Sequence, residues 1–457
     1  MALLSVNPTT EDVLQTFEEF SDRQVDAALQ QAHDAQRAWR STPYGERASR
    51  LQGVARVLRE QKSRLATLAT TEMGKPIVEA EGEIEKCAWN CDFYAEHAAT
   101  FLADEHVQTN ASESYIAFEP LGVVLAIMPW NFPFWQVIRF AAPALMAGNG
   151  AILKHASNVP GCAVAIEEIF RTAGLPEGLF RTVLVPGSKV EALIADPRIQ
   201  AVTLTGSSEV GERVASAAGK HLKKQVLELG GSDPFIVLAD ADLDAAAATA
   251  VRARNQNNGQ SCIAAKRFIV EEAVADQFTD KFASAVRALR VGDPMQRETN
   301  VGPLARGDLR DALSEQVERS VARGARTIVG GHAVNGKGFF FAPTILDGVT
   351  DEMPAFREET FGPVAAVIRA GDAHDAVRLA NDTEYGLGAA LWTRDTRRAK
   401  ELARRIEAGS VFINGMVASD PRLPFGGIKR SGYGRELGTY GIKEFVNIQT
   451  VWIGPGQ

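Results

Sequence analysis

The sequence contains little cysteine: its 457 residues include only Cys87, Cys91, Cys162 and Cys262. Four thiols spread over this length do not form a disulfide framework, and they fit a protein of the reducing cytoplasm. The N-terminal residues Met1-Ala-Leu-Leu-Ser-Val have no basic region and no sustained apolar core, so no signal peptide is predicted.

Long hydrophobic runs and an excess of positive charge are also absent. The most apolar stretch, residues 121–145, is interrupted by Asn131, Arg139 and prolines, which argues against a membrane span. The formal net charge is -8, with acids and bases interspersed, and this argues against nucleic-acid binding as the main task. An anionic ligand in a local basic pocket remains compatible with this composition.

What the sequence does contain is a regular alternation of strands and helices. Residues 23–104 show helical spacing of apolar residues and are expected to be mostly helical. Alternating units then follow, with strands at 122–127, 151–154, 181–185, 201–205 and 225–229 and helices at 134–146, 160–173, 188–195 and 209–219. This order predicts a doubly wound parallel sheet that binds ligands beyond its strand ends.

A second α/β unit is predicted from residue 234 to about residue 424. It starts with a strand at 234–238 and continues with helix 242–256, strand 267–270 and helix 274–289. Residues 106–119 are polar and β-prone and are expected to form a hairpin. The tail, residues 440–453, is expected to form a strand that pairs with an edge elsewhere, in this chain or in another subunit.

Cys262 ends the segment Asn255-Gln-Asn-Asn-Gly-Gln-Ser-Cys262, in which Gly259 breaks a predicted helix. A thiol among small amides and a hydroxyl can be solvated and reached, so Cys262 is a candidate nucleophile; the alternative is an inert thiol near a turn. Cys87 and Cys91 lie four residues apart on a predicted helix. No second pair with metal-ligand spacing follows, so core packing is favoured over a metal site.

Two segments suggest a phosphate or ribose site. Thr205-Gly-Ser-Ser-Glu-Val-Gly211 follows a strand and opens a helix, where free N–H groups favour phosphate, although a plain turn explains it equally well. Lys154 ends a strand that should reach the same sheet edge; the alternative is a solvated lysine.

Two polar residues suggest acyl chemistry. Glu228 lies in an apolar strand before two glycines, and burial without a partner would raise its pKa toward that of a general base; the alternative is an edge acid facing water. Asn131 offers an uncharged N–H donor at a strand-to-helix turn, which suits an oxyanion; the alternative is a helix N-cap.

Seven motifs together identify a family resemblance. They are Pro129-Trp-Asn-Phe-Pro133, Lys154-His-Ala-Ser157, Thr205-Gly-Ser207, Glu228-Leu-Gly-Gly231, Gly259-Gln-Ser-Cys262, Glu359-Thr-Phe-Gly-Pro363 and Pro424-Phe-Gly-Gly427. In this order, and along nearly the whole chain, they resemble the aldehyde dehydrogenases. The resemblance implies a Rossmann-like cofactor domain (1–105 and 120–230), an α/β catalytic domain (231–424) and a small β oligomerisation element (106–119 and 435–457).

The resemblance also implies roles for single residues. Cys262 would be the nucleophile and Glu228 the base that activates water, and Asn131 would form an oxyanion hole with the backbone N–H of Cys262. The nicotinamide cofactor would be bound by Trp130, Lys154, Ser157, Gly206, Ser207, Glu359 and Phe361. An aldehyde would then be oxidised through a thiohemiacetal and a thioester on Cys262, without a metal.

Ser157 bears on the choice of cofactor. In similar enzymes that prefer NAD, an acid often stands here and repels a 2′-phosphate, whereas a serine removes that repulsion and can donate a hydrogen bond. NADP is therefore the expected cofactor, with NAD possible.

Within the family, the segment Asn414-Gly-Met-Val-Ala-Ser-Asp-Pro-Arg-Leu-Pro424 is most similar to short bacterial succinate-semialdehyde dehydrogenases. Arg139 and Ser419 match residues that bind the substrate carboxylate, although Arg139 could instead serve helix packing or a salt bridge. Relatives have a second carboxylate-binding arginine at the position of Gln256. Some relatives also have a cysteine that forms a redox disulfide, and this chain has Ala264 at that position.

The expected function is therefore oxidation of succinate semialdehyde to succinate by a homodimer or homotetramer. The alternatives are a dehydrogenase of another short aldehyde such as glutarate semialdehyde, and a binding protein that keeps the fold without turnover. A reductase of acyl phosphates or acyl thioesters is disfavoured by Glu228, because such enzymes need no water-activating acid.

Overall fold

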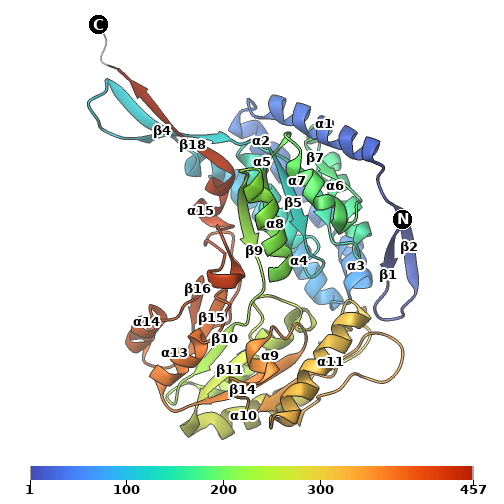
Figure 1. The fold of residues 1–457 in the computed structure, drawn as a ribbon, viewed down its shortest axis with the longest axis vertical. Coiled ribbons are helices and arrows are strands. Elements are labelled where there is room, and N and C mark those ends of the chain that lie inside the picture. The colour runs from blue at the N-terminus through green and yellow to red at the C-terminus, as the bar shows by residue number, and fades with distance from the viewer. Residues whose placement is uncertain (1, 455–457) are drawn as a thin grey trace.

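The computed structural model describes residues 2–454, which form two α/β lobes and a projecting three-stranded arm (Figure 1). The first lobe is built on a six-stranded sheet with the order β17-β9-β8-β5-β6-β7. Its strands are β5 (Val123–Met128), β6 (Gly150–His155), β7 (Phe180–Thr182), β8 (Ile199–Thr205), β9 (Lys224–Glu228) and β17 (Gly432–Tyr433). All pair in parallel except β17, which runs antiparallel to β9.

Helices surround this sheet as the alternation predicts. They are α1 (Asp22–Trp39), α2 (Tyr44–Glu60), α3 (Lys62–Met73), α4 (Ile77–Phe101), α5 (Trp135–Met146), α6 (Pro160–Thr172), α7 (Val190–Ala195) and α8 (Ser208–Lys220). Every residue of β5 is buried, as expected for a continuous apolar strand covered on both faces. The predicted doubly wound parallel sheet is confirmed.

The second lobe is built on a seven-stranded sheet with the order β12-β13-β14-β11-β10-β15-β16. The strands are β10 (Pro234–Val237), β11 (Arg267–Glu271), β12 (Arg326–Val329), β13 (Thr344–Asp347), β14 (Val364–Ala370), β15 (Gly388–Trp392) and β16 (Ser410–Ile413). Its helices are α9 (Leu243–Asn255), α10 (Glu272–Arg287), α11 (Gly307–Ala322), α12 (Pro354–Arg357), α13 (Ala373–Asn381) and α14 (Thr396–Ala403).

The arm pairs two distant parts of the chain. Strand β18 (Val446–Ile453) runs antiparallel to β4 (Glu113–Pro120), and β3 (Glu105–His106) pairs with the other edge of β4, so the predicted hairpin is confirmed. The tail was predicted to form a strand over residues 440–453, and this is wrong for residues 440–445. Leu437 and Gly438 have positive φ angles and start a short helix, α15 (Gly438–Ile442), which delays the strand to Val446.

The N-terminal hairpin was not predicted from the sequence. Strands β1 (Ala2–Val6) and β2 (Val13–Glu18) pair with each other, and β1 packs beside α3 and α6 (Figure 1). Their short apolar alternation gives too weak a signal to stand out against the long helices that follow. Within residues 2–454, no helix combines the length and the apolarity that a bilayer crossing needs.

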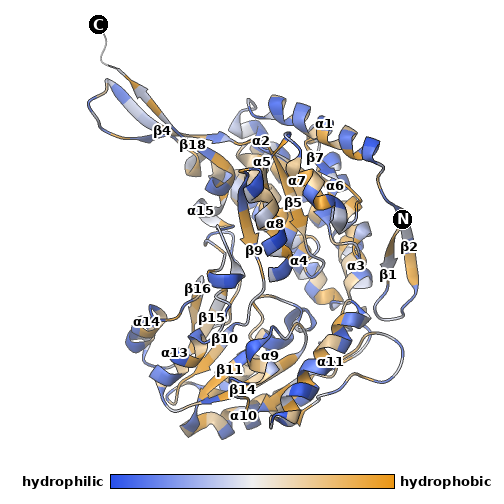
Figure 2. Cartoon of the chain, viewed as in Figure 1, coloured by the Kyte–Doolittle hydropathy of each residue, from blue (hydrophilic) through white to orange (hydrophobic). Residues whose placement is uncertain are grey.

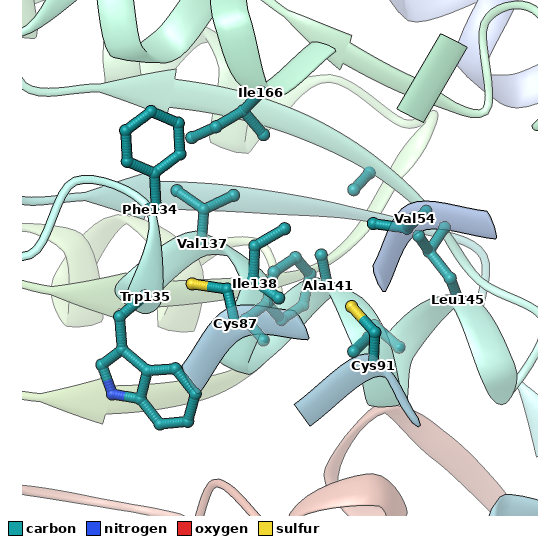
Figure 3. Packing of buried hydrophobic residues seen from close by; sticks show 14 of the residues in the cluster. Val54, Cys87, Cys91, Phe134, Trp135, Val137, Ile138, Ala141, Leu145 and Ile166 are labelled. Atoms are coloured by element: carbon teal, nitrogen blue, oxygen red, sulfur yellow. The ribbon is translucent and has the colours of Figure 1, made fainter. Parts of the chain in front are cut away.

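The largest core lies between α4, α5 and the first sheet. Cys87 and Cys91 point from α4 toward Ile138 and Ala141 of α5 (Figure 3), and both thiols are fully buried. Burial raises the pKa of each thiol, which makes thiolate metal ligands unfavourable. The prediction of core packing is therefore confirmed. Figure 2 shows the same arrangement throughout, with apolar strands inside and hydrophilic helix surfaces outside.

A buried ion pair fixes the start of α5, which follows directly after the segment that contains Asn131. Glu83 on α4 pairs with Lys75 in the interior. The other Glu83 oxygen accepts hydrogen bonds from the backbone N–H groups of Phe134 and Trp135, both at 2.8 Å. Glu83 thus acts as a long-range N-cap, because these first-turn N–H groups have no partner within the helix.

We expect Glu83→Ala to lower the free energy of unfolding by about 3–5 kcal/mol, because it leaves a buried lysine unpaired. Glu85→Ala on the same helix is the matched control. Glu85 is exposed and pairs with Arg59 at 2.8 Å, so its loss should cost less than about 1 kcal/mol. Urea denaturation followed by tryptophan fluorescence measures both, and equal effects would contradict the capping role.

Candidate active site

Cys262 lies in a loop between α9 and β11, at the junction of the two lobes. Helix α9 ends at Asn255, before the predicted break at Gly259, because Asn257 and Asn258 adopt left-handed conformations with φ angles of 56° and 59°. Asparagine tolerates this region better than most residues. The two side chains fix the turn: the Asn258 amide donates to the carbonyls of Gly74 and Pro303, both at 2.8 Å.

Lys266 holds the same loop in place through hydrogen bonds to its carbonyl groups. Its fully buried Nζ donates to the carbonyl oxygens of Ser261 at 3.0 Å, Cys262 at 2.8 Å and Ala264 at 3.3 Å. It also forms an ion pair with Glu359 at 3.3 Å. The sequence analysis missed this residue; its only signal was a lysine immediately before a fully buried strand.

The loop opens onto a cavity of about 550 Å³. Residues from α4, α5, α9 and the segment after β16 line this cavity, among them Lys86, Gln136, Arg139, Cys262, Ser419 and Phe425. Cys262 is the one cysteine that is only partly buried, whereas Cys87, Cys91 and Cys162 are enclosed in the core. The structure therefore places the predicted nucleophile where a small molecule can reach it.

The thiol of Cys262 is held in its neutral form. Burial raises its pKa to about 12, and the positive charges of Lys266 and Arg139 only partly oppose this effect. Glu359 and Glu228 add to the rise. Nucleophilic attack at neutral pH therefore needs a base that takes the thiol proton.

Glu228 ends β9 and is 2% exposed, so the alternative of an edge acid facing water is wrong. Strand β17 covers that edge, with Gly432 opposite Glu228. Among the described residues, neither carboxyl oxygen has a hydrogen-bond partner. Burial and the nearby carboxyl of Glu436 raise the pKa of Glu228 well above its usual range, while Arg139 and Arg435 oppose the rise. These are the conditions of a general base.

Asn131 is hydrogen-bonded to the loop that contains Cys262. Its Nδ2 donates to the backbone carbonyl of Gln260 at 3.1 Å, and the backbone carbonyl of Asn131 accepts from Asn257 Nδ2 at 2.8 Å. The N-cap alternative is wrong, because α5 starts at Trp135 and its N-cap is Phe134. Asn131 lies before the helix, and its amide carries a second N–H that this hydrogen bond does not use.

The residues predicted to bind a cofactor gather beyond the carboxyl ends of β5, β6 and β8. The rings of Trp130 and Phe361 meet edge to face, with centroids 5.7 Å apart. Lys154 is the penultimate residue of β6 and is partly buried, and Ser157 is exposed three residues later. Gly206 and Ser207 connect β8 to α8, and Ser207 Oγ accepts from the backbone N–H of Val210. Glu359 belongs to the second lobe, and its carboxylate accepts from Gly231 N at 3.2 Å.

The two predicted substrate residues differ in their environment. Arg139 is buried, forms an ion pair with Glu436 and lies over the Phe425 ring at 4.7 Å. The alternative that Arg139 forms a salt bridge is therefore confirmed. Arg139 also lines the cavity. Ser419 lines the cavity and accepts a hydrogen bond from Lys86 at 2.7 Å. The sequence analysis missed Lys86, because an isolated lysine on a long helix gives no signal.

Comparison with known protein families matches residues 2–451 to a family described as "Aldehyde dehydrogenase family". The chain belongs to the aldehyde dehydrogenase family. The resemblance drawn from the seven motifs is confirmed, and so is the aldehyde dehydrogenase fold.

Named relatives in this family match over the full length. A Synechocystis protein named "Probable succinate-semialdehyde dehydrogenase", with NADP(+), is 54% identical over 453 residues, which cover 99% of this chain and 100% of its own. The "Succinate-semialdehyde dehydrogenase 1" of Mycobacterium tuberculosis, also with NADP(+), is 50% identical over 456 residues, with coverage of 99% and 100%. The crystal structure of succinic semialdehyde dehydrogenase from Streptococcus pyogenes in complex with NADP+ superposes with a TM-score of 0.97 at 38% identity, with coverage of 99% and 100%.

The partial exposure of Cys262 and its raised pKa predict how its thiol reacts with an alkylating reagent. We expect iodoacetamide to modify one thiol per native chain, at a rate that rises through pH 10 without a plateau, because the pKa of Cys262 is about 12. Mass spectrometry of quenched samples gives the site and the rate. Cys262→Ala should abolish the modification, and a rate that levels off below pH 8 would contradict the neutral thiol.

Proposed function

We propose that this protein oxidises succinate semialdehyde to succinate with NADP as the hydride acceptor. The observation that carries the proposal is the position of Cys262 on a cavity, with the buried, unpartnered carboxyl of Glu228 close enough to influence its pKa. The choice of substrate is supported by the names of the full-length relatives and by the basic residues that line the cavity, Lys86, Arg139, Arg252 and Arg297.

The first half of the reaction takes place at sulfur. The Cys262 thiol loses its proton to water in the cavity, and the thiolate forms a C–S bond with the aldehyde carbon. The carbonyl oxygen becomes an oxyanion, which the free amide N–H of Asn131 stabilises by donating to it. When bound, the nicotinamide supplies the site that accepts the hydride, and a thioester remains on Cys262.

The second half is hydrolysis of the thioester. Glu228 takes a proton from water, whose oxygen bonds to the acyl carbon, while Asn131 again donates to the oxyanion. The C–S bond then breaks, and the Cys262 thiolate takes the proton from Glu228, which restores both groups. The acid product loses its own proton to solvent and leaves as succinate.

The residues present fit a dinucleotide. Helix α8 is a 13-residue helix whose first-turn N–H groups lie beside Gly206 and Ser207, which suits a pyrophosphate. Lys154 forms no ion pair within residues 2–454, and burial lowers its pKa, so an anionic ligand group would stabilise its charge. Trp130 and Phe361 offer apolar ring surfaces at the cysteine side. The exposed hydroxyl of Ser157 can accommodate a 2′-phosphate, as NADP requires.

The two lobes support the expected division of labour. We propose that residues 1–105 and 120–230 bind the cofactor, and that residues 231–424 carry the catalytic loop and the cavity wall. Residues 106–119 and 435–457 would form the oligomerisation element, of which residues 455–457 lie outside the described part of the chain. On β18, Ile448, Trp452 and Ile453 are exposed apolar residues, a pattern suited to contact in a homodimer or homotetramer.

The cellular site of the reaction follows from the thiol chemistry. We propose that the protein acts in the cytoplasm, because all four cysteines are free and Cys262 must stay reduced to act as a nucleophile.

A substrate panel with both cofactors tests the proposal. We expect the highest kcat/KM for succinate semialdehyde with NADP, lower values for glutarate semialdehyde and butanal, and weaker use of NAD. A preference for butanal would contradict the substrate, and a strong preference for NAD would contradict the argument from Ser157. No turnover of any aldehyde would favour a binding protein.

We expect Glu228→Gln to lower kcat by about 10²- to 10⁴-fold, because an amide cannot accept the proton of water. In stopped-flow measurements this variant should still release a burst of reduced cofactor near one per active site, since hydride transfer precedes hydrolysis. Cys262→Ala is the control and should show neither burst nor turnover. Loss of the burst in Glu228→Gln would contradict a role confined to hydrolysis.

A further inference from the structure

Lys86 projects from α4 into the wall of the cavity that contains Cys262. Its Nζ lies 4.4 Å from the centroid of the Trp135 ring and donates to Ser419 Oγ at 2.7 Å. Within residues 2–454 it forms no ion pair with a carboxylate. A partly buried ammonium with two uncommitted N–H groups is costly unless an anion completes its shell.

The other basic residues of the cavity are differently placed. Arg139 pairs with the buried carboxylate of Glu436, and Arg297 pairs with Glu81 through both oxygens at 2.9 and 3.0 Å. Arg252 lies on the exposed face of α9. Of these four basic residues, only Lys86 is partly buried in the cavity wall without an ion pair to a carboxylate of the described residues.

The acids near Lys86 are also occupied. Glu83, one turn earlier on α4, is held by Lys75 and by the start of α5. Asp420, next to Ser419, is held by the Arg422 guanidinium. An anion that enters the cavity would thus meet Lys86 without displacing either carboxylate from it.

Ser419 completes a two-donor arrangement. Because Lys86 donates to Ser419 Oγ, the hydroxyl proton of Ser419 is free to point elsewhere. An ammonium and a hydroxyl 2.7 Å apart can donate to the two oxygens of one carboxylate, and hydrogen bonds that involve an ionised group are the strong ones.

We infer that Lys86 is a further cation that recognises the carboxylate of the substrate, with Ser419 as its neighbouring donor. The inference rests on the proposed function and assigns its specificity to a residue of α4. It also accounts for Gln256 at the position where an arginine was expected, because Lys86 on α4 supplies a positive charge in its place.

The test compares succinate semialdehyde with butanal, an uncharged aldehyde with the same number of carbons, at pH 7. The pKa of Lys86 is lowered to about 8 by burial and by Arg139, so most of it is protonated there. In Lys86→Met we expect the ratio of the two kcat/KM values to fall about 10- to 100-fold. The fall should appear in the KM of succinate semialdehyde, because the steps at sulfur are common to both substrates.

Two further variants make the result unambiguous. Lys220→Met, at the exposed end of α8, removes a lysine outside the cavity and should leave the ratio unchanged. Lys86→Gln replaces Lys86→Met if the latter does not fold, which turnover of butanal reports directly, and it should also lower the ratio.

Each outcome decides the inference. A wild-type preference for succinate semialdehyde that Lys86→Met or Lys86→Gln removes supports it. The same preference retained in both variants overturns the role of Lys86 and leaves the proposed function standing. A wild-type enzyme without any preference for the carboxylate overturns both.

Discussion

The structure depends most on one buried ammonium group, that of Lys266. A charge with no exposure to solvent is unfavourable unless its donors are satisfied, and here three loop carbonyls and the Glu359 carboxylate satisfy them. The same contacts fix the backbone on both sides of Cys262 and connect it to Glu359 from the segment before β14. The geometry of the nucleophile and that of Glu359, a proposed cofactor contact, are therefore consequences of one side chain.

Buried carboxyl groups serve two distinct purposes in this fold. Glu83 and Glu72 accept backbone N–H groups at the starts of α5 and α6, with Glu72 bonded to Gly161 N at 2.9 Å and Cys162 N at 2.8 Å. They orient helices that no local residue caps. Glu228, in contrast, has no such donors to oppose the effects of burial and of the Glu436 carboxyl, which raise its pKa. The difference between a structural and a reactive acid lies in the hydrogen bonds that surround it.

The sequence was sufficient for the order of strands and helices, because buried parallel strands and amphipathic helices have strong local patterns. It was also sufficient to bring Cys262, Glu228 and Asn131 into one site through the family resemblance. It could not show that Lys86 meets Ser419, since 333 positions separate them and the contact exists only after both lobes have formed. The same holds for Arg139: its helix was predicted, but its partner Glu436 lies in an irregular segment near the C-terminus.

The last strands of the chain complete elements that begin near its start. Strand β17 covers the edge of β9, β18 pairs with β4 along eight residue pairs, and the Asn149 side chain donates to the Phe445 carbonyl at 2.9 Å. During translation, the first lobe therefore stays incomplete until residues 432–453 leave the ribosome. A nascent or truncated chain would expose two unpaired strand edges, and chaperones and proteases could recognise these before any active enzyme forms.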